Sequence, residues 1–416
     1  MLQLSPPLPL TVDYQSENGI TAEDEEGLLL ALEQRDRVLH LRLRLPVPEL
    51  QRLIMAINEE FPILEYLIVH PWANDGTVLM LPETLQAPNL RHLVLRGLSC
   101  PVRPRLHPTA VGLVTLWLTI SHSSAYIQPS MLLQWISFMP QLENLLIFFT
   151  FSVPNCDIER QLTHTPITTH ISLPNLRLIW FRGVSAYLES VVCRIATPRV
   201  ENLYIRFFKQ LTFSVPRLVL FTNTTENLRF YNAEIAFLDE RVYVAMYFHK
   251  ADTYSPFMVR VDCQHLDWQL SSMAQISSAL NQVSSAVEHL VLEHEVHSRS
   301  SEEHNDVDRI EWRNLLRSFS NVKTLLVEDG LIEQLSRCLQ LENGESSLEL
   351  LPELQDLTYY GHRDTSDAFT SFIDSRRNAG RPVTLVRRSA SPSPSESPFA
   401  PAITSSSSET GNDIDT

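Results

Sequence analysis

An apolar residue followed by two more at three and five positions further on recurs along this chain, and this spacing constrains the fold most. In APNLRHLVLRG (87–97) it is formed by Leu90, Leu93 and Leu95. A helix would continue at steps of three and four, whereas a half-buried strand would alternate strictly. Three followed by two therefore indicates a buried turn residue that leads into a short strand with every second side chain facing inward.

The pattern repeats at a nearly constant interval. Its units begin about two dozen to three dozen residues apart, and the two weakest begin at Thr225 and Pro256. A stack of similar coils requires such a period, because each unit must add one strand and one return segment. The units start at Val38, Leu64, Leu90, Leu113, Leu142, Leu176, Val200, Thr225, Pro256, Val287, Val322 and Leu354.

The segments between these strands have apolar residues at helical spacing. In 48–62 the residues Leu50, Leu53, Ile54 and Ile57 share one face. Strand, helix and strand with short connections predict a parallel sheet with right-handed crossovers. The fold class expected is therefore α/β, a leucine-rich-repeat solenoid or horseshoe with a parallel concave sheet, a helical outer face and degenerate repeats. Helices are expected in 21–34, 48–62, 129–140, 185–198, 271–290, 310–322 and 366–380.

Two regions depart from the period. Residues 230–256 alternate like strands and are expected to form an inserted hairpin. Residues 387–416 are rich in Ser and Pro and carry few apolar side chains, so we expect a disordered tail. The domain organisation predicted is one repeat domain over 1–386, followed by that tail.

Charge and cysteine content limit the partners and the compartment. The net charge is −16 and the pI about 5.3, which disfavours nucleic acids and anionic membranes as partners. The five cysteines are scattered and form no CxxC pair, as is typical of a reducing compartment. No apolar run approaches the ~18 residues of a membrane span. We expect a cytoplasmic or nuclear protein.

No motif of catalysis or of cofactor binding stands out. The segment EHLVLEHEVHSRSSEEH offers His289, His294, His297 and His304, but lacks the zinc-protease spacing and is interpreted as a polar loop after a strand. There is no G-x-S-x-G, phosphate loop or G-x-G-x-x-G, and glycines number 11 in 416 residues. The sequence therefore predicts a protein that is not an enzyme and needs no cofactor or metal.

The repeats PNLRHLVLRG, PQLENLLIF, LPNLRLIWFRGVSAYLESVV and PELQDLTYYG resemble those of fungal F-box-associated leucine-rich-repeat proteins. The likeness covers about Leu8 to Val386. It implies an adaptor that recruits a target protein on the concave face, while an F-box would bind a Skp-type adaptor and a cullin. This sequence shows no F-box. The alternative is a leucine-rich-repeat scaffold, or a truncated paralogue, with no ubiquitin-ligase link.

The residues between the inward-facing ones point to a binding surface. Applying the alternation to successive units puts Trp117, Leu146, Trp180 and Tyr204 in one column of the concave sheet. Aromatic residues beside arginines are typical of binding hot spots. A loop, the 230–256 segment or the tail would be the alternative cover for this face. The candidate partner-binding residues are Tyr66, Arg96, Trp117, Phe148, Trp180, Arg182, Tyr204 and Arg206.

Overall fold

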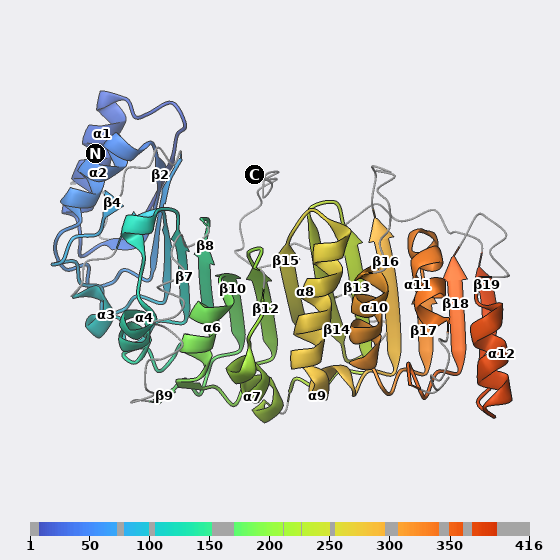
Figure 1. The fold of residues 1–416 in the computed structure, drawn as a ribbon. Coiled ribbons are helices and arrows are strands. Elements are labelled where there is room, and N and C mark those ends of the chain that lie inside the picture. The colour runs from blue at the N-terminus through green and yellow to red at the C-terminus, as the bar shows by residue number, and fades with distance from the viewer. Residues whose placement is uncertain are drawn as a thin grey trace.

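The computed structural model describes residues 8–72, 79–99, 105–151, 170–210, 212–225, 227–249, 254–295, 307–340, 349–360 and 368–388. One sheet of 15 strands runs the length of the molecule (Figure 1). Its order is β1-β2-β3-β5-β7-β8-β10-β12-β15-β14-β13-β16-β17-β18-β19. The segments expected to neighbour one another around residues 67, 93, 116, 145, 179 and 203 lie side by side in that order, which confirms the predicted stacking.

The strands of this sheet are short and evenly spaced along the chain. They are β1 Leu10–Gln15, β2 Val38–Leu45, β3 Tyr66–Pro71, β5 His92–Arg96, β7 Thr115–Ile120, β8 Asn144–Phe149, β10 Leu178–Gly183, β12 Asn202–Phe207, β13 Asn232–Leu238, β14 Arg241–Tyr247, β15 Phe257–Asp262, β16 His289–Glu295, β17 Thr324–Val327, β18 Asp356–Tyr360 and β19 Thr384–Arg388. Two small parallel pairs lie apart from it: β4 Leu79–Met80 with β6 Leu98–Ser99, and β9 Ile171–Ser172 with β11 Ile195–Ala196.

The helices occupy the return segments. They are α1 Ala22–Glu33, α2 Val47–Ala56, α3 Leu106–Thr109, α4 Pro129–Ile136, α6 Ser185–Val192, α7 Pro216–Thr224, α8 Leu266–Ala279, α9 Asn281–Ser284, α10 Val307–Arg317, α11 Ile332–Leu339 and α12 Thr370–Asn378. Each of the seven predicted helical ranges contains or overlaps one of them. The sequence patterns missed α3, α7 and α11, which are short and fall between the ranges chosen.

Residue-level signals fix where some helices begin and end. The hydroxyl of Thr21 accepts the backbone N–H of Asp24, so Thr21 caps α1 as its position in the sequence predicts. Gly380 lies beyond α12 with φ of +74°, a left-handed conformation that an L side chain rarely adopts and that suits a helix-ending glycine. Local chemistry therefore sets these boundaries before any packing does.

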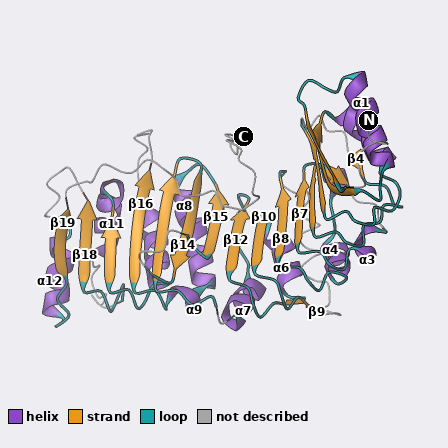
Figure 2. Ribbon diagram, turned by 180° about the vertical axis from the view of Figure 1, so that it is seen from behind, coloured by secondary structure: helices purple, strands orange, loops and turns teal. Residues whose placement is uncertain are grey.

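The recurring apolar residues form the core, as the period predicts. Leu90, Leu93 and Leu95 are each at most 1% exposed, and the corresponding residues of the other units are buried as well. They belong to one buried cluster with residues of the helices. The helices of the described residues lie on one side of the sheet (Figure 2). The return helices contact their neighbours along the stack, α4 with α6, α6 with α7, and α8 with α10. Sheet and helix layer thus share one continuous core.

One predicted unit was placed wrongly. Thr225, Leu228 and Phe230 are buried, but they precede the strand instead of forming it. The strand β13 carries the same spacing five residues later, with Phe230 leading to Ala233 and Ile235. The prediction failed because alanine is a weak apolar signal and Leu228 offered a more obvious match.

The segment after Phe230 interrupts the parallel order. β13 and β14 form an antiparallel hairpin, and β14 pairs antiparallel with β15. In the sheet β15 lies beside β12, and β13 lies beside β16, so three consecutive strands are inserted in reverse order. The sheet is therefore mixed, whereas the sequence predicted a parallel sheet. The hairpin belongs to the sheet itself and does not fold over its face.

These features define a leucine-rich-repeat solenoid of the α/β class with irregular repeats. Near the N-terminus the sheet turns, with α1 and α2 on its outer side (Figures 1 and 2). Arg387 and Arg388, which the sequence assigned to the tail, end β19. The remainder of the expected tail, 389–416, lies outside the described residues.

Candidate protein-binding face

The sheet face opposite the helices, here called the open face, is not covered by any helix of the described residues (Figure 2). Side chains alternate along each strand: in β7, β10 and β12 every second residue is buried and those between are partly exposed. The 230–256 segment, one of the alternatives for cover, contributes strands to the sheet instead. The open face therefore keeps accessible side chains between β1 and β15.

An apolar row crosses the open face from β3 to β15. Strand register places Trp117 beside Leu146, Leu146 beside Trp180, and Trp180 beside Tyr204, as the alternation predicts. Leu146 is 1% exposed, whereas the other members are partly exposed. In order, this apolar row is Ile68, Val94, Trp117, Leu146, Trp180, Tyr204 and Met258.

The aromatic side chains of this region contact one another edge to face. Phe148 stands between two tryptophans, with ring centroids 5.6 Å from Trp117 and 5.1 Å from Trp180. Trp180 continues to Tyr204 at 5.8 Å. T-shaped pairs of this kind contribute about 0.5–1.5 kcal/mol beyond their buried area, so the aromatic group is held in a defined shape.

Arginines lie two residues further along the same strands. Arg182 is in register with Phe148 on one side and Arg206 on the other, and Arg206 is in register with Arg260. Arg96 is in register with Thr119, next to Phe148. We call this the arginine row; it consists of Arg44, Arg96, Arg182, Arg206 and Arg260.

Aromatic faces hold several of these guanidinium groups. Arg96 lies over Trp117 at 4.4 Å from the ring centroid, and Arg44 lies over Trp72 at 3.7 Å. Cation–π contacts orient an arginine without neutralising its charge. These groups therefore remain able to bind an anionic group.

At the end of the arginine row formed by β12 and β15, the only carboxylate in contact with the arginines among the described residues is that of Asp262. The Nε–H of Arg206 lies 2.9 and 2.7 Å from the two carboxylate oxygens of Asp262, and Arg260 Nε lies 3.4 Å from the nearer of them. Arg182, on the next strand, has no carboxylate within ion-pair distance among the described residues and lies 5.7 Å from the ring of Phe208. Asp262 thus pairs with two arginines, Arg206 and Arg260, while Arg182 beside them has no carboxylate partner among the described residues.

Burial and mutual repulsion act on the protonation of the row. Desolvation, and then the neighbouring Arg44 and Arg42, lower the pKa of Arg96. Desolvation, followed by Arg206 and Arg241, lowers the pKa of Arg260 to about 10. Both groups stay protonated at neutral pH, and the arginines among the causes show that these guanidinium groups lie close enough to repel one another.

Tyr66, the N-terminal candidate residue, lies in a different row. Its ring stacks on His92 at 4.3 Å and meets His40 edge to face at 4.4 Å. The register continues from His92 through Thr115 to Asn144. Tyr66 thus flanks the apolar row on the side opposite to the arginines, and the eight candidate residues fall into three adjacent rows.

The charge on the open face changes from positive to negative beyond β15. The carboxylate of Glu234 on β13 accepts the hydroxyls of Tyr243 at 2.7 Å and Tyr247 at 3.4 Å. Desolvation, followed by this carboxylate, raises the pKa of both tyrosines. Glu293 on β16 lies one strand from β13. The basic region is therefore bounded on its C-terminal side by acidic groups.

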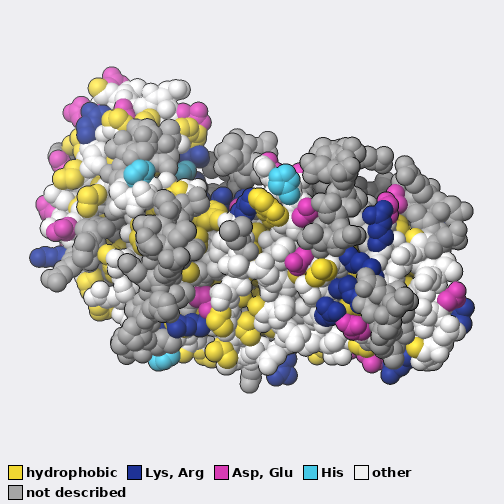
Figure 3. All heavy atoms as spheres, viewed as in Figure 1, with side chains coloured by type: hydrophobic (Ala, Val, Ile, Leu, Met, Phe, Trp, Pro, Cys, Tyr) yellow, Lys and Arg dark blue, Asp and Glu magenta, His cyan; other side chains and the backbone are white. Residues whose placement is uncertain are grey.

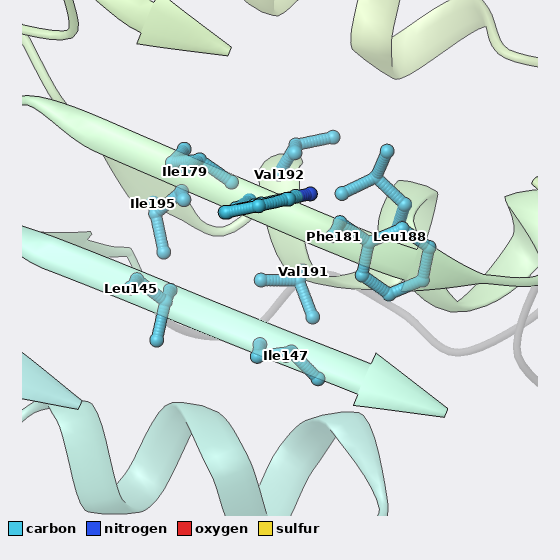
Figure 4. Close-up of a pocket in the computed structure, with 9 residues that line it drawn as sticks. Leu145, Ile147, Ile179, Phe181, Leu188, Val191, Val192 and Ile195 are labelled. Atoms are coloured by element: carbon cyan, nitrogen blue, oxygen red, sulfur yellow. The ribbon is translucent and has the colours of Figure 1, made fainter. Parts of the chain in front are cut away.

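The rest of the described molecule offers no competing chemistry. A cavity of about 10 Å³ between β8, β10 and α6 is lined by apolar side chains such as Leu145, Phe181 and Val191 (Figure 4). With no polar partner for a water, it is a packing gap. Charged side chains of both signs are interspersed on the helix side (Figure 3).

No three His, Cys, Asp or Glu side chains come together as metal ligands among the described residues. Of the segment interpreted as a polar loop, His289 and His294 lie in β16 instead, and His297 and His304 lie outside the described part of the chain. No helix there combines the length and apolar character that crossing a bilayer demands.

The sequence selected eight residues but missed others on the same face. Arg44, Met258 and Arg260 follow from the same alternation applied to VLHLRLRL (38–45) and PFMVRV (256–261), so the signal was present. Asp262 had no such signal, because its contact with Arg206 depends on β15 lying next to β12.

No family model matches the chain, and no curated protein is similar to it in sequence. Among solved structures, the leucine-rich repeat-containing protein LegL7 from Legionella pneumophila aligns with 87% of this chain and 97% of its own, at 12% identity and a TM-score of 0.30. The fold is defined by the chain's own strand order.

Proposed function

We propose that this chain is a non-catalytic protein-binding module whose partner docks on the open face. The observation that carries the proposal is the partly exposed apolar row beside the arginine row. Contiguous apolar surface bordered by polar groups is typical of protein interfaces, and tryptophan, tyrosine and arginine are the residues most often found at their hot spots. The rigid sheet holds these side chains in place before binding, which lowers the entropic cost of association.

The resemblance to F-box-associated repeats supports a more specific role. Under that proposal the open face recruits a target protein, and ubiquitin transfer is performed by other subunits reached through a Skp-type adaptor and a cullin. The alternative is a scaffold with the same fold and no ligase link. Mixing the purified chain with a Skp-type adaptor distinguishes the two: co-elution supports the ligase adaptor, and separate elution supports the scaffold.

The docking surface is tested by affinity capture with paired variants. Trp117→Ala combined with Trp180→Ala removes the centre of the apolar row, and we expect it to abolish capture of the proteins that the wild-type chain retains. The matched control is Leu220→Ala on α7, because Leu220 is 64% exposed on the helix side. Capture that survives in the tryptophan variant and is lost in the control would contradict the proposal.

Stability must be measured with the same variants. A melting temperature of the tryptophan variant within a few degrees of wild type assigns the loss of capture to the surface itself. If the variant unfolds, Arg96→Gln with Arg206→Gln replaces it, because these partly exposed side chains lie at the edge of the apolar row and are not part of the core.

A further inference from the structure

We infer that the segment recognised by the open face is an acidic stretch of a partner protein, with carboxylates on the arginine row and an apolar side chain against Phe148. This inference rests on the proposed function and specifies the chemistry of the partner. It is drawn from the balance of charge, the distribution of hydrogen-bond donors and the spacing of the strands.

The balance of charge on this part of the face is positive, although the whole chain carries −16. At the open-face positions within the strands from β1 to β15, the two carboxylates of Asp13 and Asp262 face a larger number of guanidinium groups. Asp13 lies 3.5 Å from Arg42, and Asp262 is shared as described. The arginines are Arg42, Arg44, Arg96, Arg182, Arg206 and Arg260. A partner that brings carboxylates would complete this set.

The same region has donors without acceptors. The Nε atoms of Arg44 and Arg182 and the indole nitrogen of Trp117 are buried and have no hydrogen-bond partner among the described residues. Burying a donor without an acceptor costs free energy, which is lower when an anionic acceptor approaches the group. The face therefore selects a segment rich in acceptors.

The positive charge is divided into two groups. Arg96 lies on β5 and Arg182 on β10, with β7 and β8 between them. Three strand steps of about 4.8 Å separate the groups by about 14 Å, which an extended peptide spans in about four residues. Phe148 occupies the interval, in contact with Trp117 and Trp180. The segment that fits has two acidic clusters on either side of a large apolar residue.

A protein segment is favoured over nucleic acid by the charge of the whole molecule. Nucleic acid binding depends on neutralising many phosphates, which a chain of −16 opposes outside this local region. The basic region also ends at Glu234 and Glu293, which would repel a continuing polyphosphate backbone. A short acidic segment needs only the row itself.

The test is the binding of a labelled peptide to the full chain by fluorescence anisotropy. The probe is Glu-Glu-Glu-Gly-Phe-Gly-Glu-Glu-Glu, and the control peptide has lysine in place of glutamate. We expect the glutamate probe alone to bind, with an affinity that falls as salt rises. Binding of both peptides, or of neither, would overturn the inference.

Variants locate the site. Arg182→Gln with Arg206→Gln should lower the affinity for the probe by about tenfold or more, because charge-assisted hydrogen bonds are lost. The matched control is Arg337→Gln, because Arg337 pairs with Glu333 on α11, on the helix side, and should change the affinity by less than about twofold. Equal binding by the double variant and wild type would overturn the inference.

Two further arms exclude other occupants. An oligothymidylate of ten nucleotides is tested for displacing the labelled probe. If it does so at concentrations as low as those at which the unlabelled probe does, the arginine row prefers phosphates, and the choice of a protein partner is overturned. In the full chain, Glu396→Gln, Glu409→Gln, Asp413→Asn and Asp415→Asn neutralise the C-terminal segment. If this variant binds the probe and the wild-type chain does not, the occupant of the arginine row is the chain's own C-terminal segment.

This inference and the proposed function can fail separately. If the probe does not bind while a protein partner still requires Trp117 and Trp180, docking on the open face stands and the acidic chemistry is wrong. If the partner binds elsewhere, both fail.

Discussion

The Nε–H of Arg206 on β12 lies within hydrogen-bond distance of both carboxylate oxygens of Asp262 on β15, at 2.9 and 2.7 Å, across 56 positions of sequence. The contact exists because the reversed insertion of β13, β14 and β15 places β15 beside β12. Asp262 also lies 3.4 Å from Arg260, so one carboxylate holds two arginines in place. It occupies the position that an acidic partner would otherwise contact.

Removing that carboxylate should strengthen binding of an acidic segment. Asp262→Asn keeps the shape of the side chain but leaves Arg206 and Arg260 without an internal counter-charge, so we expect the glutamate probe to bind about threefold to tenfold more tightly. The measurement is the dissociation constant at low and high salt, and the gain should shrink as salt rises. Equal or weaker binding by Asp262→Asn would contradict this prediction.

Neighbouring residues on one strand should differ in their contribution to stability. Leu116 is 0% exposed and faces the helices, whereas Trp117 lies on the open face. We expect Leu116→Ala to lower the free energy of unfolding by about 2–5 kcal/mol, as for buried leucines in general. Trp117→Ala should cost less, about 1–2 kcal/mol, because it loses mainly contacts with Phe148 and Arg96. Urea unfolding of the two variants measures the difference, and the reverse order would place Trp117 in the core.

Gly97 should not tolerate a side chain. Its φ is +63°, and a Cβ there would stand 2.9 Å from Cγ of Pro71, a ring with little freedom to move. We expect Gly97→Ala to destabilise the protein by about 1–3 kcal/mol. Gly112→Ala is the control, since nothing lies within 4 Å of its Cβ and its φ is not in the left-handed region. A thermal melt of Gly97→Ala that matches that of Gly112→Ala would refute the assignment of strain at this turn.

His70, on β3 beside the arginine row, should make stability depend on pH. Desolvation, and then Arg96, Arg44 and Arg42, lower its pKa from 6.5 to about 3. The folded protein therefore favours the neutral imidazole, and this contribution is present above pH 6.5 and is lost as the pH falls toward 3.

The measurement compares wild type with His70→Gln. Between pH 7 and pH 5 the wild type should lose roughly 1–2 kcal/mol that the variant retains, after allowance for solvent screening of a partly exposed group. His170→Gln, at an exposed position, is the control for the loss of a histidine. Parallel stability profiles for wild type and His70→Gln would show that the arginines exert no such effect on this ring.

The fold was predictable because it depends on local periodicity. Leu41, Leu67, Leu93 and their counterparts could be aligned without knowledge of the structure, since a strand side chain repeats every two residues and each coil repeats the strand. The same alignment placed Trp117, Trp180 and Tyr204 in register. Order along the stack follows when consecutive units pack side by side.

The remaining features depend on contacts between distant segments. Nothing in YNAEIAFLDERVYVAMYF (231–248) states that β13 will lie beside β16 instead of β12, because either strand offers the same backbone partners. The pairing of Arg206 with Asp262 follows from that choice. Whether the open face is covered also lay beyond sequence patterns, which show alternation but not what packs against it.

The most direct test of docking on the open face is site-specific photo-cross-linking. A benzoylphenylalanine at Met258, in the apolar row, should form adducts with the captured partner, whereas the same group at Leu220 on the helix side should form none. Adducts from position 220 with none from position 258 would contradict the proposed docking surface.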